Sequence, residues 1–290
     1  MKRILILLHE SERFEHPHYL IDDLRDAWQK RGLHVSYAYG VRERHEADLL
    51  IPHIDLTHTP PEYAEYIRSF PAAVNRDVVD ISKRRISTHL LRRGEDFHGP
   101  VIVKTDNNSG GVPEDELSRW RHPFLARLRR KAAAHMEHAP GQRFAWKSVL
   151  REYPIYSSLA EVPAGVFRNR ALVVERFLPE REGDRYFVRN YFCLGSHTRS
   201  TRIADSTPFV KRPWAKLVDE GLAVPEPVLN LRRQLGLDYG KIDYAMHEGE
   251  VVILDVNRTP NLSKVPEEAA RTASKLADGI WSLLPNGGNT

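Results

Sequence analysis

The feature that most constrains this chain is a segment near its C-terminal end, residues 240–261. Two stretches rich in β-type residues flank Glu248-Gly249 there, and a short turn between two such stretches predicts a β-hairpin. The first strand carries Asp243, and the second carries Asp255 and Asn257. Residues two apart on a strand share a face, so Asp255 and Asn257 project together. The hairpin therefore offers an acid on each strand to one ligand.

The turn decides whether Asp243 and Asp255 can act together. A three-residue loop or a bulge would put both carboxylates on one face, whereas a strict two-residue turn would put them on opposite faces. Two carboxylates and an amide oxygen on one wall suit Mg²⁺, which prefers oxygen ligands and completes its shell with water and phosphates. We predict a metal site at Asp243, Asp255 and Asn257, for Mg²⁺ or alternatively Mn²⁺. The competing explanation is a polar outer sheet face.

The first part of the chain alternates strand-like and helix-like patterns. Arg3–Leu8 is continuously apolar, as in a strand covered on both faces. Residues 17–31 then repeat apolar positions at helical spacing. This predicts a βαβ lobe with a parallel sheet. Open α/β sheets bind ligands at the carboxyl ends of their strands, so the segment His9–His16 is expected to face a ligand, with His9, Glu10 and Arg13 as candidates.

Composition excludes several classes of protein. The longest apolar run, Ile4–Leu8, is far shorter than the roughly 20 residues of a membrane span, and no signal-peptide cleavage site follows it, so we expect a cytoplasmic protein with no membrane partner. The single cysteine, Cys193, excludes an intramolecular disulfide and a cysteine-based zinc site.

The charge of the chain bears on its partners. The net charge is +4, and acidic residues are interleaved with the basic ones almost everywhere, so nucleic acid is not the expected partner. The densest basic run, Arg127–Lys131, falls in a long helix that the pattern predicts over residues 114–138. An anionic small molecule could use the remaining positive charge.

Asp243, then Asp255-Val256-Asn257 followed by Thr259-Pro260, resembles the metal-binding signature of the ATP-grasp superfamily. The resemblance is to carboxylate–amine ligases of the D-alanine–D-alanine ligase and ribosomal-protein glutamate ligase types. Two positions differ: Asp255 stands where the family usually has Glu, and Asn261 where it often has Gly. The resemblance implies an α/β protein, α+β in its C-terminal part, with an ATP-grasp fold. Its expected domains are an N-terminal pre-ATP-grasp domain (1–75), a central lobe (76–175) and a C-terminal lobe (176–290).

The resemblance also implies which residues bind ATP. Lys83 would bind phosphate, and Lys104 would contact a phosphate or the adenine edge. The loop after Lys104 would lie over the phosphates, because glycines let backbone N–H groups approach phosphate oxygens. The strand at 172–178 matches the hinge whose main chain binds adenine. A carboxylate after the hinge usually holds the ribose, and both Glu182 and Asp184 are candidates. The implied nucleotide ligands besides the lysines are Ser109, Gly110, Gly111, Glu175, Arg176, Phe177, Leu178, Glu182 and Asp184.

Three cations are predicted to be catalytic. Lys241 occupies a place where D-alanine–D-alanine ligases carry a basic residue near the reacting centre. Arg189 and Arg202 lie in the same lobe, together with Arg199 and Lys211, and a clamp of such cations suits phosphoryl transfer, which depends on positioning and charge neutralisation. Each of these four, taken alone, is also compatible with an ordinary surface cation.

The reaction implied by the resemblance is an ADP-forming ligation of small molecules. ATP phosphorylates a carboxylate, and an amine or similar nucleophile displaces the acyl phosphate. Two alternatives stay open: a kinase of the same fold acting on a hydroxyl, and a non-catalytic nucleotide- or RNA-binding protein on a degenerate scaffold. Asp255 and the run Arg127–Lys131 motivate the second. A homodimer is compatible with each of these functions.

Overall fold

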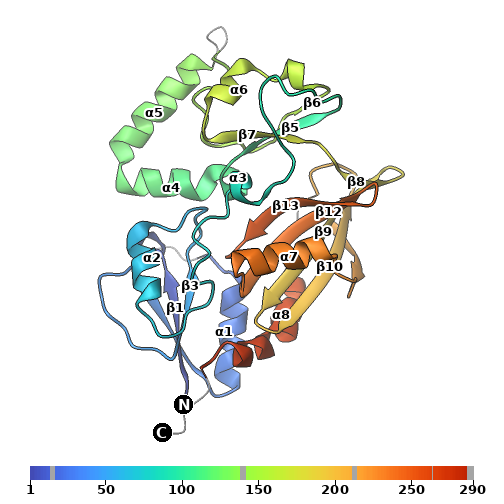
Figure 1. Cartoon of the computed structure of the whole chain (residues 1–290). Helices are drawn as coiled ribbons and strands as arrows, with labels where there is room; N and C mark the ends of the chain where they lie inside the picture. The colour runs from blue at the N-terminus through green and yellow to red at the C-terminus, as the bar shows by residue number, and fades with distance from the viewer. Residues whose placement is uncertain (14–16, 138–141, 211–213, 263, 286–290) are drawn as a thin grey trace. The chain divides into compact units, whose positions relative to one another are not determined.

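The computed structural model describes residues 1–13, 17–137, 142–210, 214–262 and 264–285. Their contacts divide the chain into two compact units (Figure 1). Unit 1 comprises Met1–Asp55, Thr59–Val79 and Glu180–Thr290, and unit 2 comprises Leu56–His58 and Asp80–Pro179. The three-domain division at 75 and 175 stays a prediction, but the first and third of those stretches share one hydrophobic core. His16 and Lys211 lie outside the described residues.

The N-terminal part of unit 1 is the predicted parallel βαβ arrangement. Its sheet has the strand order β2-β1-β3, and the run of apolar residues in β1 is buried because the strand is central and covered. After β1 comes a short 3₁₀ segment, η1, and α1 then buries Leu20, Leu24 and Trp28 on one face. The elements are β1 (Arg3–Leu8), η1 (Glu10–Arg13), α1 (Leu20–Lys30), β2 (His34–Tyr39), β3 (Leu49–His53) and α2 (Pro61–Arg68).

The C-terminal part of unit 1 is an antiparallel sheet, drawn in gold to red in Figure 1. Its strand order is β11-β10-β9-β12-β13, and β8 pairs with β9. The alternation of buried and part-exposed residues along β12 gives the sheet two chemically different faces. The elements are β8 (Glu180–Glu182), β9 (Arg185–Leu194), β10 (His197–Asp205), β11 (Lys216–Glu220), α7 (Glu226–Leu235), β12 (Tyr239–His247), β13 (Glu250–Asn257), α8 (Pro266–Leu276) and η4 (Ala277–Ser282).

One core joins the two sheets of unit 1. It contains residues of β1 and α1 together with Phe192, Leu276 and Ile280 from the C-terminal part. Polar bonds reinforce it: the Trp28 indole N–H donates to the carbonyl of Ala277 at 2.9 Å, and α1 packs on α8. The stretches that sequence reasoning treated as separate domains are therefore one packed body.

Unit 2 is built around a four-stranded sheet of order β4-β7-β5-β6. One face of β5 and β7 is buried against a core that includes Val103, Val174 and Phe144. The helix predicted over 114–138 is two helices, since Pro123 follows the first and cannot donate a helical N–H to it. The elements are α3 (Lys83–Ile86), β4 (Leu90–Leu91), β5 (Val101–Thr105), η2 (Asn108–Gly111), α4 (Val112–Arg121), α5 (Pro123–Met136), β6 (Ile155–Tyr156), η3 (Leu159–Glu161), α6 (Ala164–Arg168) and β7 (Leu172–Arg176).

The α/β class predicted from the sequence is confirmed by these elements. Within the described residues, none of the helices combines the length and the apolar character that crossing a bilayer requires.

Asn75 links the two sheets of unit 1 and generates a stability prediction. It is 3% exposed and has a left-handed backbone, with φ of 51°. Its amide N–H donates to the carbonyl of Tyr239 at 2.7 Å, and its amide oxygen accepts from the backbone N–H groups of Asp238 and Tyr239. Asn75→Ala would leave buried backbone groups unsatisfied in a conformation that alanine disfavours, so we expect a loss of about 2–4 kcal/mol in the free energy of unfolding.

Urea unfolding of this variant should be compared with that of Asn230→Ala, an exposed position on α7, which should change stability by less than about 0.5 kcal/mol. Equal effects of the two substitutions would contradict the linking role of Asn75.

Candidate functional site

The register of the β12–β13 hairpin decides the geometry of the predicted metal site. The turn is a two-residue one, with His247 opposite Glu250 and positive φ at Glu248 and Gly249 (49° and 86°). A strict ladder from this turn would separate the two aspartates. The register shifts, however, between Asp243 and Tyr244, which leaves one extra residue on β13. Asp243 therefore lies directly opposite Asp255, and their side chains share a face.

Four of the predicted residues thus line one face of the sheet, because Lys241 lies opposite Asn257 next to the aspartate pair. The Lys241 ammonium contacts Asp243 Oδ2 at 2.8 Å, with both side chains about one-fifth exposed. The side-chain amide of Asn190 on β9 donates to Asp243 Oδ1 at 2.7 Å. Asn190 was missed by sequence reasoning, since only the pairing of β9 with β12 brings it opposite Asp243.

Asn257 is held in place by the loop that follows it. Its amide oxygen accepts hydrogen bonds from the backbone N–H of Thr259 at 2.7 Å and from the Thr259 hydroxyl group at 3.1 Å. The same hydroxyl contacts Asp55 Oδ1 at 2.8 Å. A hydroxyl has one proton, so donation to Asp55 leaves Asn257 with acceptor capacity for another partner.

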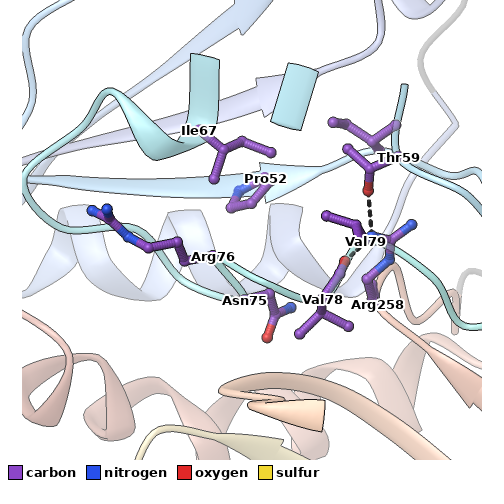
Figure 2. Close-up of a pocket in the computed structure, with 9 residues that line it drawn as sticks. Pro52, Thr59, Ile67, Asn75, Arg76, Val78, Val79 and Arg258 are labelled. Atoms are coloured by element: carbon purple, nitrogen blue, oxygen red, sulfur yellow. Dashed lines mark hydrogen bonds between the residues drawn. The ribbon is translucent and has the colours of Figure 1, made fainter. Parts of the chain in front are cut away.

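Arg258 fixes the loop from its other side. Its guanidinium is 6% exposed and donates to the Thr59 hydroxyl group and to the carbonyl of Val78, as Figure 2 shows. The cavity beside it has a volume of about 10 Å³, enough for a single water molecule at most. Arg258 is therefore a structural tether rather than a lining residue of a substrate pocket.

The donor set on the shared face fits a hard divalent cation. Asp243, Asp255 and Asn257 contribute only oxygen atoms, the ligands that Mg²⁺ prefers. Within the described ranges, no cluster of three or more His, Cys, Asp or Glu side chains is arranged to hold a metal. The predicted set has only two carboxylates, so the remaining ligands would have to come from water and phosphate.

The two arginines predicted to act with Lys241 lie on the other face of the sheet. On β9, Arg189 lies opposite Tyr244 of β12 and opposite Arg202 of β10. The next residue, Asn190, lies opposite Asp243. Adjacent residues of a strand project to opposite faces, so Arg189 and Arg202 project away from Asp243. Both guanidinium groups contact Glu180, at 2.9 Å in each case. The prediction that Arg189 and Arg202 clamp phosphate beside Lys241 is therefore not supported by the register. They form an ion network around a buried carboxylate.

Glu180 is the centre of that network. Burial alone would raise the pKa of Glu180, but the hydrogen bond from Arg189 and the backbone N–H of Met246 outweigh it and hold the pKa below its usual value. Arg202 also packs over the ring of Phe187, with its guanidinium carbon 3.7 Å from the ring centroid. Through these contacts Glu180 of β8 holds together residues of β9, β10 and β12.

The two ribose candidates lie at the β8–β9 turn. Glu182 ends β8 and contacts Arg202, and Asp184 follows Gly183 in the exposed turn. Neither is buried, so both can reach a ligand. The choice between them stays open.

Unit 2 brings together both predicted lysines and the glycine-rich loop. Lys83 is 2% exposed, and its ammonium donates to Asn108 at the start of the loop at 2.9 Å. Lys104 is also buried and contacts Glu175 Oε2 on β7 at 2.7 Å. Both cations are thus held in fixed positions beside the elements that the resemblance assigned to ATP.

The loop itself has the backbone of an anion cradle. Ser109, Gly110 and Gly111 have positive φ in succession, at 51°, 68° and 76°. A Cβ atom on Gly110 would lie 2.4 Å from the carbonyl oxygen of Leu150, and one on Gly111 would lie 2.3 Å from that of Ser148. Glycine is therefore required at both positions. Successive backbone N–H groups in such a turn can converge on an anion.

The strand β7, which matches the predicted adenine-binding hinge, carries a buried acceptor without a hydrogen-bond partner among the described groups. The backbone N–H groups of Arg176 and Phe177 donate within unit 2, to His89 and Pro100, so they are not adenine donors. Among the groups that the structure describes, Glu175 Oε1 is buried and lacks a hydrogen-bond partner. A buried unsatisfied acceptor is costly unless a ligand supplies a donor, and adenine has an exocyclic amine. Together with the glycine cradle, this atom fits ATP.

The loop after β1 contributes an acidic cluster to unit 1. His9 is buried and stacks on Tyr63 with ring centroids 5.2 Å apart, and the Tyr63 hydroxyl accepts the backbone N–H of Glu10. Arg13 is exposed. Burial, and after it the nearby Asp55 carboxylate, raises the pKa of Glu12 to about 8. Glu12 therefore keeps its proton at neutral pH, next to the Asp55 carboxylate that contacts Thr259.

The comparisons with known proteins bear on the fold. No model of a protein family matches the sequence, and no curated protein matches it. Solved structures do match over nearly the whole chain. The ATP-grasp ligase PsnB, in complex with a precursor variant, Mg and ADP, has a TM-score of 0.53 at 8% identity and covers 98% of this chain and 99% of its own. A RiPP-associated ATP-grasp ligase from Chryseobacterium gregarium, with ADP and a leader and core peptide, has a TM-score of 0.51 at 11% identity, covering 99% and 98%.

A third structure agrees. A RimK-domain ATP-grasp protein from Sphaerobacter thermophilus has a TM-score of 0.50 at 12% identity, covering 96% of this chain and 99% of its own. The chain has the ATP-grasp fold. At these identities the likeness establishes the arrangement of the backbone, and the chemistry of the ATP-grasp site has to be argued from the residues of this chain.

The glycine cradle of the ATP-grasp fold generates a paired prediction. In Gly111→Ala the new side chain has a disfavoured φ and also collides with the carbonyl oxygen of Ser148. We therefore expect the collision to lower the free energy of unfolding by about 1–3 kcal/mol, in addition to the cost of the disfavoured φ. Gly94→Ala is the matched control, because Gly94 has φ of 85° and nothing within 4 Å of a Cβ atom; it should cost only about 1–2 kcal/mol. Urea unfolding and the thermal shift on adding Mg-ATP are the measurements. Retention of a full Mg-ATP shift by Gly111→Ala would contradict the cradle.

The raised pKa of Glu12 predicts how stability depends on pH. The folded chain keeps a proton on Glu12 up to about pH 8, whereas the unfolded chain releases it near 4.5. The folded state therefore binds more protons in this window, so this contribution to stability is complete below about pH 4.5 and is lost as the pH rises through about 8. Between these two pH values, the free energy of unfolding of Glu12→Gln should therefore fall by roughly 2 kcal/mol less than that of the unmodified chain.

The check is urea unfolding at several pH values across this window. Glu46→Gln, an exposed position in the same unit, serves as the control and should leave the pH profile unchanged. A Glu12→Gln profile parallel to that of the unmodified chain would show that Glu12 titrates normally.

Proposed function

We propose that the chain is an ATP- and Mg²⁺-dependent ligase that activates a carboxylate as an acyl phosphate and joins it to an amine or similar nucleophile. The observation that carries the proposal is the pairing of Asp243 with Asp255 beside Lys241 and Asn257 on one face of the hairpin. Two like charges directly opposite each other destabilise a sheet. Such a pair is expected where a cation binds.

Unit 2 supplies independent support. Its buried lysines, Lys83 and Lys104, lie beside a loop whose glycines cannot be replaced without collision. This combination suits a polyphosphate, since cations and converging backbone N–H groups both stabilise phosphate oxygens. Two of the similar structures contain ADP, and one of these also contains Mg. The nucleotide is accordingly the best-supported part of the proposal.

In this proposal each group has a distinct task. Asp243, Asp255 and Asn257 would hold the cation, and Asn190 orients Asp243 through its amide N–H. Lys83, Lys104 and the Ser109–Gly111 backbone would hold phosphate oxygens. When bound, Mg-ATP supplies the phosphoryl group that converts the carboxylate into an acyl phosphate. Lys241 would hold the oxygens of that product, which keeps it in place until the amine attacks.

Arg189 and Arg202 have a positioning task in this scheme. Because they surround Glu180 on the opposite face, they fix the strands that carry Asn190 and Asp243. Cytoplasmic location, small-molecule substrates and a homodimer remain predictions from the sequence.

The proposal predicts a loss of activity on neutralising either aspartate. Asp243→Asn or Asp255→Asn should lower Mg-ATP turnover by on the order of a hundredfold or more, because the cation loses a charged ligand. Glu250→Gln is the control, since Glu250 is exposed on the same hairpin and should leave turnover unchanged. Release of ADP and phosphate would be measured with Mg-ATP and panels of carboxylic acids and amines.

The products separate the alternatives. An amide with stoichiometric ADP and phosphate supports the ligase, whereas a stable phosphorylated hydroxyl compound would show a kinase. A thermal shift with Mg-ATP but no turnover on any panel would favour the non-catalytic binding protein.

A further inference from the structure

The α4–α5 helical pair of unit 2 is unusually poorly buried. Figure 1 shows the two helices joined at an angle, with α5 extending along unit 2. Of the 14 residues in α5 only Ala126 is buried, and α4 buries none. Helices in proteins are stabilised mostly by packing an apolar face. A helix of this length with one buried residue therefore has a face available to a partner.

The helical pair borders a groove large enough for a peptide. The groove has a volume of about 1150 Å³. Ala126, Ala133 and Trp146 contribute apolar surface to it, and Gly111 and Asn107 of the glycine-rich loop lie at its wall. The Trp146 side chain is 61% exposed. The groove thus combines small apolar side chains, which permit close approach, with one large aromatic surface.

The charge of the groove is positive. Four exposed cations on α5 line it, and none of them makes an ion pair with any residue that the structure describes; they are Arg127, Arg129, Arg130 and Lys131. Two further cations of the lining are already neutralised, since Arg119 contacts Asp115 at 3.1 Å and Lys147 contacts Glu137 at 3.0 Å. The uncompensated charge is therefore concentrated on one turn and a half of α5.

Large apolar side chains are exposed on the same helix. Phe124 is 71% exposed, Leu125 51% and Leu128 47%. None of the three is among the residues that line the groove, so they add apolar surface to α5 outside it. Exposed apolar side chains of this size are typical of surfaces that bind another polypeptide. A purely solvated charged helix would not need them.

We propose that this groove binds an acidic polypeptide segment that carries apolar side chains among its carboxylates. The cations of α5 complement the carboxylates, and the alanines and Trp146 accommodate the apolar side chains. A single-stranded nucleic acid fits less well. Among the described residues of the lining, Trp146 is the one aromatic side chain, and Glu114 and Asp115 in the same wall repel phosphates. The binding goes beyond the proposed ligase activity and requires neither ATP nor catalysis.

The test is a binding measurement on the full chain without nucleotide. α5 is about 21 Å long, so an extended peptide of roughly eight residues covers it. The probe is a fluorescein-labelled peptide of this length in which Glu alternates with Leu, followed by fluorescence polarisation. We expect saturable binding and a loss on the order of tenfold when the four α5 cations are changed to Gln, because each exposed ion pair contributes modestly and the contributions multiply.

A matched variant controls for net charge. Lys30, Arg44, Arg92 and Arg93 are exposed cations outside the groove, and changing these four to Gln removes the same charge. This variant should bind the peptide like the unmodified chain. Trp146→Ala should weaken peptide binding while leaving the thermal shift with Mg-ATP unchanged.

Three outcomes would overturn the proposal. The first is an equal loss of peptide binding in both charge variants, which would show nonspecific attraction. The second is a poly(U) oligonucleotide that binds more tightly than the peptide and depends on the α5 cations. The third is unchanged peptide binding with weaker Mg-ATP binding in the α5 variant, which would assign the groove to the nucleotide. An inactive but peptide-binding chain would refute the ligase alone.

Discussion

One irregularity in the β12–β13 ladder controls the chemistry available to this chain. The two-residue turn at Glu248-Gly249 would, in a regular ladder, put Asp243 and Asp255 on opposite faces. The extra residue on β13 restores the match, so that both aspartates, Lys241 and Asn257 line one wall. Without the extra residue the two aspartates would not share a face.

The two faces of the C-terminal sheet differ in their side-chain contacts. On one face Asn190 and Lys241 engage Asp243, which leaves a polar wall that is part-exposed. On the other face Glu180 is enclosed by two arginines, and the strong hydrogen bond from Arg189 keeps its pKa low despite burial. A charge-assisted pair of this kind is stiff and positions the strands on which the other face depends.

The sequence predicted the elements whose signal is local. The apolar run of β1, the hairpin and the glycine-rich loop all follow from patterns within a few residues, and the α/β class and the glycine positions agree with the structure. Pairings between distant strands carry no such signal. Sequence reasoning therefore missed Asn190, treated Arg189 and Arg202 as neighbours of Lys241, and separated the N-terminal and C-terminal parts that one core joins. The break between α4 and α5 does have a local signal, because Pro123 cannot donate a helical N–H.

The shorter acid at Asp255 is compatible with this geometry. Directly opposed residues in an antiparallel pair have Cβ atoms about 4.5–5.5 Å apart, so two short carboxylates can converge without the extra methylene of a glutamate. The Lys241 ammonium and the Asn190 amide both bind Asp243, and the backbone N–H of Val256 donates to Asp255. These contacts offset part of the repulsion between the two carboxylates. A divalent cation between two directly opposed carboxylates would offset it further, which is the physical reason to expect one there.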